Sequence, residues 1–125
     1  MILIFGGAYQ GKLSYALEKY GLTGSDIYRC GENSGMPVGK KIIYEIDKWI
    51  FSLVKAGINI EEEIGQFAKC NPNAVVICND ISCGIVPMDA ELRKWREAVG
   101  RSLAVLSKNS SEVIRLFCGI PSRLK

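Results

Sequence analysis

The apolar and polar positions of this 125-residue chain form two kinds of segment that follow one another in turn. Short apolar runs of the kind found in buried strands alternate with stretches whose apolar residues recur at helical spacing. The runs that predict strands are Ile2–Phe5, Asp26–Arg29, Lys41–Glu45, Asn73–Cys78 and Val113–Cys118. The stretches that predict helices are Leu13–Tyr20, Ile46–Gly57, a short one after Asn59, and one that runs from an N-cap at Asp89 to Leu106.

Strands that alternate with helices predict an α/β fold, with a doubly wound, mostly parallel sheet and helices on both of its faces. The length, the 48% hydrophobic and the 23% charged residues are those of one soluble domain over residues 1–125. No apolar stretch approaches the roughly 20 residues that span a bilayer, and no signal peptide is apparent. We therefore expect a cytoplasmic protein without a membrane partner.

A glycine-rich loop follows the first predicted strand directly and precedes the first predicted helix, the context that a phosphate-binding loop of a P-loop NTPase requires. Its backbone N–H groups and the N-terminus of the next helix would face the phosphates of ATP or GTP, and Lys12 would reach the β- and γ-phosphates. The candidate nucleotide-binding residues are Gly6, Gly7, Ala8, Tyr9, Gln10, Gly11, Lys12, Leu13 and Ser14. In the alternative interpretation, the glycines only make a tight turn and Lys12 is a solvated residue of the first helical turn.

Two carboxylates come directly after predicted strands, Glu45 and Asp80. Because ligands bind beyond the carboxyl ends of strands in such sheets, we expect both to lie at the same edge as the loop. Phosphoryl transfer needs positive charge around the transferred group and carboxylates that hold Mg²⁺ or orient the attacking hydroxyl. Lys12, Glu45 and Asp80 are therefore the candidate catalytic residues, with Glu45 and Asp80 as metal ligands; each carboxylate also has an alternative interpretation as a helix cap or solvated loop residue.

One position of the loop departs from the pattern. The residue after the lysine is normally Ser or Thr, whose hydroxyl coordinates Mg²⁺, but this chain has Leu13 there and a serine only at Ser14. An isobutyl side chain offers no ligand to the metal.

The cysteines, the absent histidine and the charge narrow the chemistry further. The five cysteines show no C-x-x-C spacing and the chain has no histidine, which argues against a zinc site and excludes an imidazole base. Cys78 and Cys118 fall in strand-like runs, so we expect both to pack as small hydrophobes, as in a reducing compartment. The net charge is +3, and the basic side chains of the C-terminal quarter are interpreted as solvated rather than as a nucleic-acid surface.

The apolar run that ends in Asn79 and Asp80 and continues to Pro87 resembles a known family, the adenosylcobinamide kinase/adenosylcobinamide-phosphate guanylyltransferases of cobalamin biosynthesis. The family has an apolar strand, an Asn, an acidic residue and a glycine-containing loop ending in Ile-Val-Pro. Further similarities are the N-terminal loop, the strand-terminal Glu45, the Gly100-Arg101 pair and the ending Gly119–Lys125.

The resemblance implies transfer of a phosphoryl group from ATP or GTP to adenosylcobinamide, with nucleotide, corrinoid and Mg²⁺ as ligands, and a homo-oligomer, a trimer. The family's guanylyl-accepting histidine has no counterpart here, because residues 29–41 are similar to a shortened form of the segment that carries it. The resemblance therefore does not imply the family's guanylyltransferase activity for this chain. Leu13, Ser82 and the pair Leu103-Ala104 also depart from the family pattern.

Two alternatives stay open beside a cobinamide kinase. A relative that binds nucleotide or corrinoid without catalysis would explain Leu13 and the shortened segment. A plain structural α/β module would have no nucleotide affinity.

Overall fold

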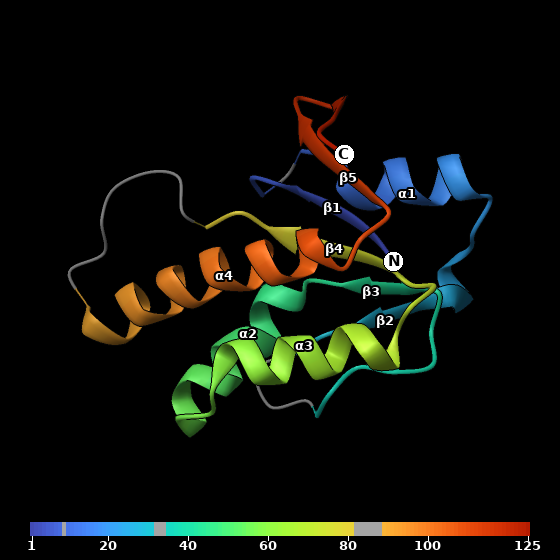
Figure 1. Ribbon diagram of the computed structural model, residues 1–125. Helices are drawn as coiled ribbons and strands as arrows, with labels where there is room; N and C mark the ends of the chain where they lie inside the picture. The colour runs from blue at the N-terminus through green and yellow to red at the C-terminus, as the bar shows by residue number, and fades with distance from the viewer. Residues whose placement is uncertain (9, 32–34, 82–88) are drawn as a thin grey trace.

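The computed structural model describes residues 1–8, 10–31, 35–81 and 89–125 (Figure 1). The strands are β1 (Ile2–Gly6), β2 (Ile27–Arg29), β3 (Ile42–Tyr44), β4 (Val75–Asn79), β5 (Glu112–Phe117) and β6 (Ile120–Arg123). The helices are α1 (Lys12–Tyr20), α2 (Ile46–Ala56), α3 (Ile60–Cys70) and α4 (Ala90–Lys108), with a 3-10 turn η1 (Gly24–Asp26) before β2.

The strands form a six-stranded sheet in the order β2-β3-β4-β1-β5-β6. Every neighbouring pair is parallel except β5 and β6, which are antiparallel. In the central pair, Gly6 of β1 lies opposite Asn79 of β4, so both strands end at the same level. The prediction of a mostly parallel α/β sheet is confirmed.

Helices cover both faces of the sheet, as predicted. Figure 1 shows α1 on one side of the strands and α2, α3 and α4 together on the other. A small cluster under α1 joins Ala16 to Ile4, Ile77 and Ile114 of the sheet. Buried parallel strands carry apolar residues on both faces, which explains why β4 reads as an uninterrupted apolar run.

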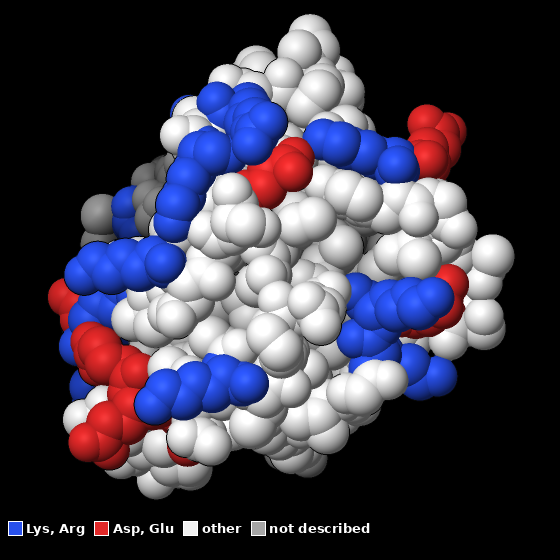
Figure 2. Space-filling view, turned by 45° about the vertical axis from the view of Figure 1, so that its right-hand side comes forward, with Lys and Arg blue, Asp and Glu red and all other residues white. Residues whose placement is uncertain are grey.

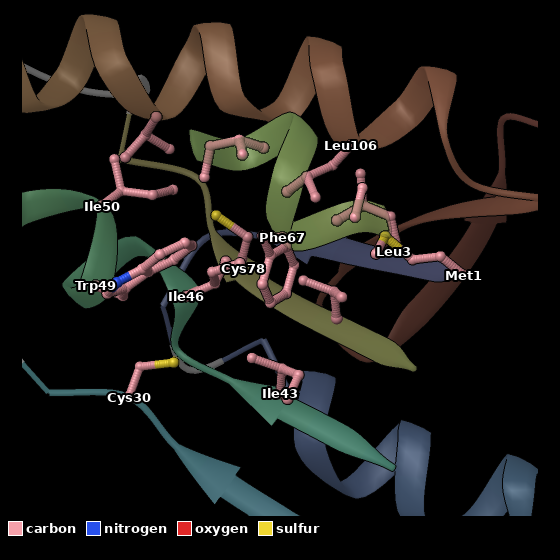
Figure 3. Close-up of a cluster of buried hydrophobic side chains, with 14 of the residues drawn as sticks. Met1, Leu3, Cys30, Ile43, Ile46, Trp49, Ile50, Phe67, Cys78 and Leu106 are labelled. Carbon is pink, nitrogen blue, oxygen red and sulfur yellow. The ribbon is translucent and has the colours of Figure 1, made fainter. Parts of the chain in front are cut away.

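The larger hydrophobic cluster lies under α2, α3 and α4 (Figure 3). Trp49 of α2 and Phe67 of α3 stack at a tilt with their ring centroids 5.4 Å apart, and both are fully buried. Leu3 and Cys78 reach this cluster from the sheet. Burial of these large side chains fixes α2 against β3 and β4, whose ends border the candidate site.

The helix ends follow the predicted signals. Asp89 caps α4, because its Oδ1 accepts the N–H groups of Glu91 at 2.8 Å and Leu92 at 3.2 Å. The Asn59 side chain caps α3 in the same way, and the acidic residues 61–63 lie in the first turn, where they face the positive end of the helix dipole. None of the helices in the described part of the chain is long and apolar enough to cross a membrane.

The C-terminal segment differs from the expectation in two ways. The predicted last strand is followed by a further one, because the chain turns back at Cys118 and Gly119 to form β6. Cys118 lies in this turn with φ at +50° and is exposed, so the expectation that it packs in the core is wrong. Cys78 is fully buried as expected.

The charged side chains are spread over the surface. On the face seen in Figure 2, Lys and Arg side chains lie around a largely uncharged centre with Asp and Glu among them. Several of them pair, for example Lys19 with Glu112 at 2.9 Å and Arg101 with Glu61 at 3.3 Å. Exposed pairs of this kind contribute little to stability.

Candidate functional site

A cavity of about 600 Å³ opens at the edge where β1, β3 and β4 end. These three strands are neighbours in the sheet, so residues that follow them meet there, as ligand sites of open α/β sheets do. The cavity is lined by Ala8, Gln10, Gly11, Lys12, Leu13, Ser14, Tyr44, Glu45, Lys48 and Asn79. Its volume is within the range of small-molecule sites.

The glycine-rich loop supplies one wall of this cavity. Ala8, Gln10 and Gly11 to Ser14 line it, whereas Gly6 and Gly7 are not among the lining residues and Tyr9 lies outside the described residues. Gly11 takes φ +82°, a left-handed conformation that glycine adopts without strain, and it precedes α1 as the N-cap. The loop therefore delivers the N-terminus of α1 to the cavity, as the sequence predicted.

The loop is fastened to the β5–β6 turn. The backbone N–H of Cys118 donates to Gln10 Oε1, and the N–H of Gly119 donates to the Gln10 carbonyl at 3.2 Å. Gly6 passes so close to β5 that a Cβ would collide with the Leu116 carbonyl oxygen. Gly6 is thus required by the packing of its own backbone against β5.

Lys12, at the first position of α1, is the buried cation of the site, with 4% of its surface exposed. Its Nζ donates to the Gly7 carbonyl at 2.6 Å, which curls the side chain back into the loop. Burial lowers the pKa of Lys12, and the negative charges of Asp47 and Glu45 act in the opposite direction. The ammonium is held at the cavity wall before any ligand enters.

Asp47 is a buried carboxylate that the sequence analysis missed. It lies in the first turn of α2, where its Oδ1 accepts the Asn79 N–H at 3.1 Å and its backbone carbonyl accepts the Trp95 indole N–H at 2.8 Å. Burial raises the pKa of Asp47, against the effect of the Asn79 hydrogen bonds. Asp47 thus ties α2 to β4 and α4 directly behind the cavity.

Glu45 lines the cavity as predicted, but its carboxylate is already paired on both oxygens. Oε1 lies 3.2 Å from the Arg29 guanidinium, and Oε2 pairs with the Lys48 ammonium. Glu45 is buried and takes φ +58° and ψ +47° at the N-cap of α2, an uncommon conformation for a residue other than glycine. Such outliers concentrate at functional sites.

Asp80 takes a different place from the one expected. Its backbone N–H donates to the Gly6 carbonyl at 2.8 Å, so the residue lies at the same sheet edge. The cavity, however, is lined by its neighbour Asn79 and not by Asp80. The structure therefore brings Lys12 and Glu45 together at the cavity and leaves Asp80 beside it. Residues 82–88, which complete the predicted loop after β4, lie outside the described residues.

Proteins usually bind Mg²⁺ through one or two carboxylates together with phosphates and water. Among the lining residues, Glu45 is the one carboxylate, and both of its oxygens are engaged by cations. Leu13 supplies no oxygen, and the other oxygen donors of the lining, such as Ser14 and Asn79, are neutral. Across the described ranges of the chain, no group of three or more Asp, Glu, Cys or His side chains could hold a metal ion.

Comparison with known proteins places this chain in a family. A family model described as cobinamide kinase / cobinamide phosphate guanyltransferase matches residues 40–124. The chain belongs to this family. The match includes the strand-terminal Glu45, the β4 segment and the β5–β6 hairpin, and it begins after the glycine-rich loop.

The chain is also similar to a curated protein. The chain is 28% identical over 81 residues to the bifunctional adenosylcobalamin biosynthesis protein CobU of Escherichia coli (strain K12). The aligned region covers 63% of this chain and 45% of that protein. The chain thus spans about half the length of the curated relative it matches.

Four lining or supporting residues were not among the predicted site residues: Tyr44, Lys48, Asn79 and Asp47. Two of them carried a usable signal. Lys48 lies three residues after Glu45 at the start of a predicted helix, a spacing at which opposite charges meet. Asn79 is the first polar residue at the end of an apolar strand. Asp47 carried no signal, because a first-turn aspartate is usually exposed.

Proposed function

We propose that this chain binds the phosphates of ATP or GTP in the cavity and transfers a phosphoryl group to the hydroxyl of an adenosylcobinamide side chain. The observation that carries the proposal is Lys12, a buried ammonium held at the wall of a 600 Å³ cavity by a glycine-rich loop. Family membership supports the corrinoid as acceptor, since the family description names cobinamide.

In this proposal the backbone N–H groups bind the phosphates, and Lys12 stabilises the phosphoryl group that is transferred. The N–H groups at the start of α1 and in the loop face the β-phosphate, where the positive end of the helix dipole favours an anion. The Lys12 ammonium leaves the Gly7 carbonyl, 2.6 Å away, for the transferred phosphoryl group. Because the ammonium is shielded from water, its interaction with developing negative charge is stronger than at the surface.

The acceptor hydroxyl attacks the γ-phosphorus and loses its proton to water, and the bond from the γ-phosphorus to the bridging oxygen breaks as the nucleoside diphosphate leaves. In this proposal the hydroxyl-bearing side chain of the corrinoid enters the cavity. Asp80, beside the cavity at the end of β4, keeps the proposed role of orienting that hydroxyl. The guanylyl transfer in the family description is not proposed for this chain, which has no histidine to accept the group.

A second candidate function is binding of nucleotide or corrinoid without transfer. The paired state of Glu45 favours it, because Arg29 and Lys48 already offset the negative charge that would attract a metal ion. Leu13 at the position of the metal-coordinating hydroxyl supports the same conclusion. In phosphoryl transfer, loss of the metal forfeits part of the charge neutralisation of the transition state.

A transfer assay separates the two candidates. Purified protein is given γ-labelled ATP or GTP and adenosylcobinamide in the presence of MgCl₂, and labelled corrinoid is measured by chromatography. We expect product with the wild type, more with Leu13→Ser, and at least about tenfold less with Lys12→Met, which keeps the shape of the side chain and removes its charge. If the wild type and Leu13→Ser both bind nucleotide but form no labelled corrinoid, the kinase proposal is wrong and the second candidate stands.

A further inference from the structure

The cluster of Arg29, Glu45 and Lys48 joins three elements at one side of the cavity. Arg29 ends β2, Glu45 follows β3, and Lys48 lies in the first turn of α2. Arg29 pairs with Glu45 Oε1 at 3.2 Å and also stacks on the Tyr44 ring, with the guanidinium carbon 4.9 Å from the ring centroid. Arg29 alone thus offsets the negative charge of Glu45, and the positive charge of Lys48 is additional.

Of the two cations in this cluster, Lys48 lines the cavity and Arg29 does not. The Lys48 side chain is 45% exposed while that of Glu45 is 9% exposed, and Lys48 lines the cavity together with Lys12. An ammonium carries three donors, so Lys48 can keep its ion pair with Glu45 and direct other N–H groups to a ligand. The cavity is therefore bordered by one lysine from α1 and one from α2.

We propose that Lys48, held by Glu45, supplies the positive charge that a divalent cation supplies at comparable loops, so that the cavity binds nucleotide polyphosphate without Mg²⁺. This inference rests on the proposed function, since it assumes that the anion in the cavity is a polyphosphate. It accounts for two departures together: Leu13 where a metal-coordinating hydroxyl is expected, and a strand-terminal carboxylate that is ion-paired instead of open. Asp47, the other carboxylate that acts on Lys12, does not line the cavity.

The test is a calorimetric titration with ATP, carried out once in EDTA and once in MgCl₂. We expect ATP to bind at least as tightly in EDTA as in MgCl₂, because the metal complex carries less charge for the lysines to attract. Lys48→Met should weaken binding in EDTA by about tenfold, the worth of one hydrogen bond to a charged group, while Lys48→Arg keeps the charge and most of the affinity.

Lys55→Met is the matched control, because Lys55 lies in the last turn of the same helix and does not line the cavity. It should bind ATP as the wild type does. Weaker binding in EDTA than in MgCl₂, or wild-type affinity in Lys48→Met, overturns the inference and leaves the proposed function standing. Absence of ATP binding in both buffers overturns the proposed function, and the inference with it.

Discussion

Single residues at the cavity take conformations and pairings that a solvated surface would not impose. Glu45 sits in the left-handed region while its carboxylate is held by two cations, and Lys12 is buried against a backbone carbonyl. Each arrangement costs free energy that the surrounding packing must offset. A site that binds an anion recovers part of this cost when the Lys12 ammonium gains a charged partner.

The buried thiol of Cys30 allows the burial of this part of the core to be measured. Burial raises the pKa of its thiol from 9.0 to about 12, and the nearby charges of Asp47 and Glu45 act in the same direction. A pKa that is higher in the folded state gives a stability contribution that is complete below pH 9 and is lost as the pH rises toward 12.

We therefore expect the wild type to lose about 1 kcal/mol more stability than Cys30→Ala between about pH 8 and pH 10. Urea unfolding of both proteins at the two pH values measures the difference. Equal losses in the two proteins would show that the Cys30 thiol is not shielded from water.

Among the elements of the described residues, the sequence predicted every strand of the parallel part of the sheet and the helices α1 to α4. These elements have strong local signals: uninterrupted apolar runs for β1 and β4, left-handed glycines that end α1 and α2, and the Asp89 cap of α4. β6 was missed because its residues 120–123 are all exposed and include Pro121, which argues against a strand in a sequence. Its formation depends on pairing with β5, which no local pattern records.

Part of the site could also be predicted from the sequence. Ligands bind at the carboxyl ends of parallel strands, and this rule predicted that Lys12 and Glu45 lie at one edge of the sheet even though the strand order was unknown. It could not tell which of Asn79 and Asp80 faces the cavity, because side-chain direction at a strand end depends on one residue of register. Nor could it show that Glu45 is ion-paired to Arg29, which lies on the neighbouring strand β2.

The β5–β6 turn and the loop act as one unit through Gln10. We expect Gln10→Ala to speed hydrogen exchange at the Cys118 amide by about fivefold, because that N–H loses its acceptor. Gln10→Glu keeps an acceptor oxygen, so it should preserve the slow exchange while its negative charge weakens ATP binding. Gln66→Ala on α3, remote from the loop, is the control. Unchanged exchange in Gln10→Ala would show that the side chain does not hold the turn.

In the whole molecule, two hydrophobic clusters pack against the central sheet, and the cavity lies at one edge of that sheet. Both hydrophobic clusters share the central sheet, and from this we infer that residues 1–125 form one domain. The homo-oligomer implied by the family resemblance stays a prediction. Phe117, Ile120 and Leu124 of the C-terminal hairpin are 64%, 69% and 59% exposed, and analytical ultracentrifugation would show whether the chain associates.

The proposed function depends on phosphate binding at the N-terminus of α1. An ¹⁵N-labelled sample titrated with ATP tests this most directly, since each backbone amide reports on its own surroundings. We expect the largest shifts on the amides of Gly7, Gly11, Lys12, Leu13 and Ser14, and we expect inorganic triphosphate to reproduce them. Shifts confined to other parts of the chain, or no shifts at saturating ATP, would contradict it.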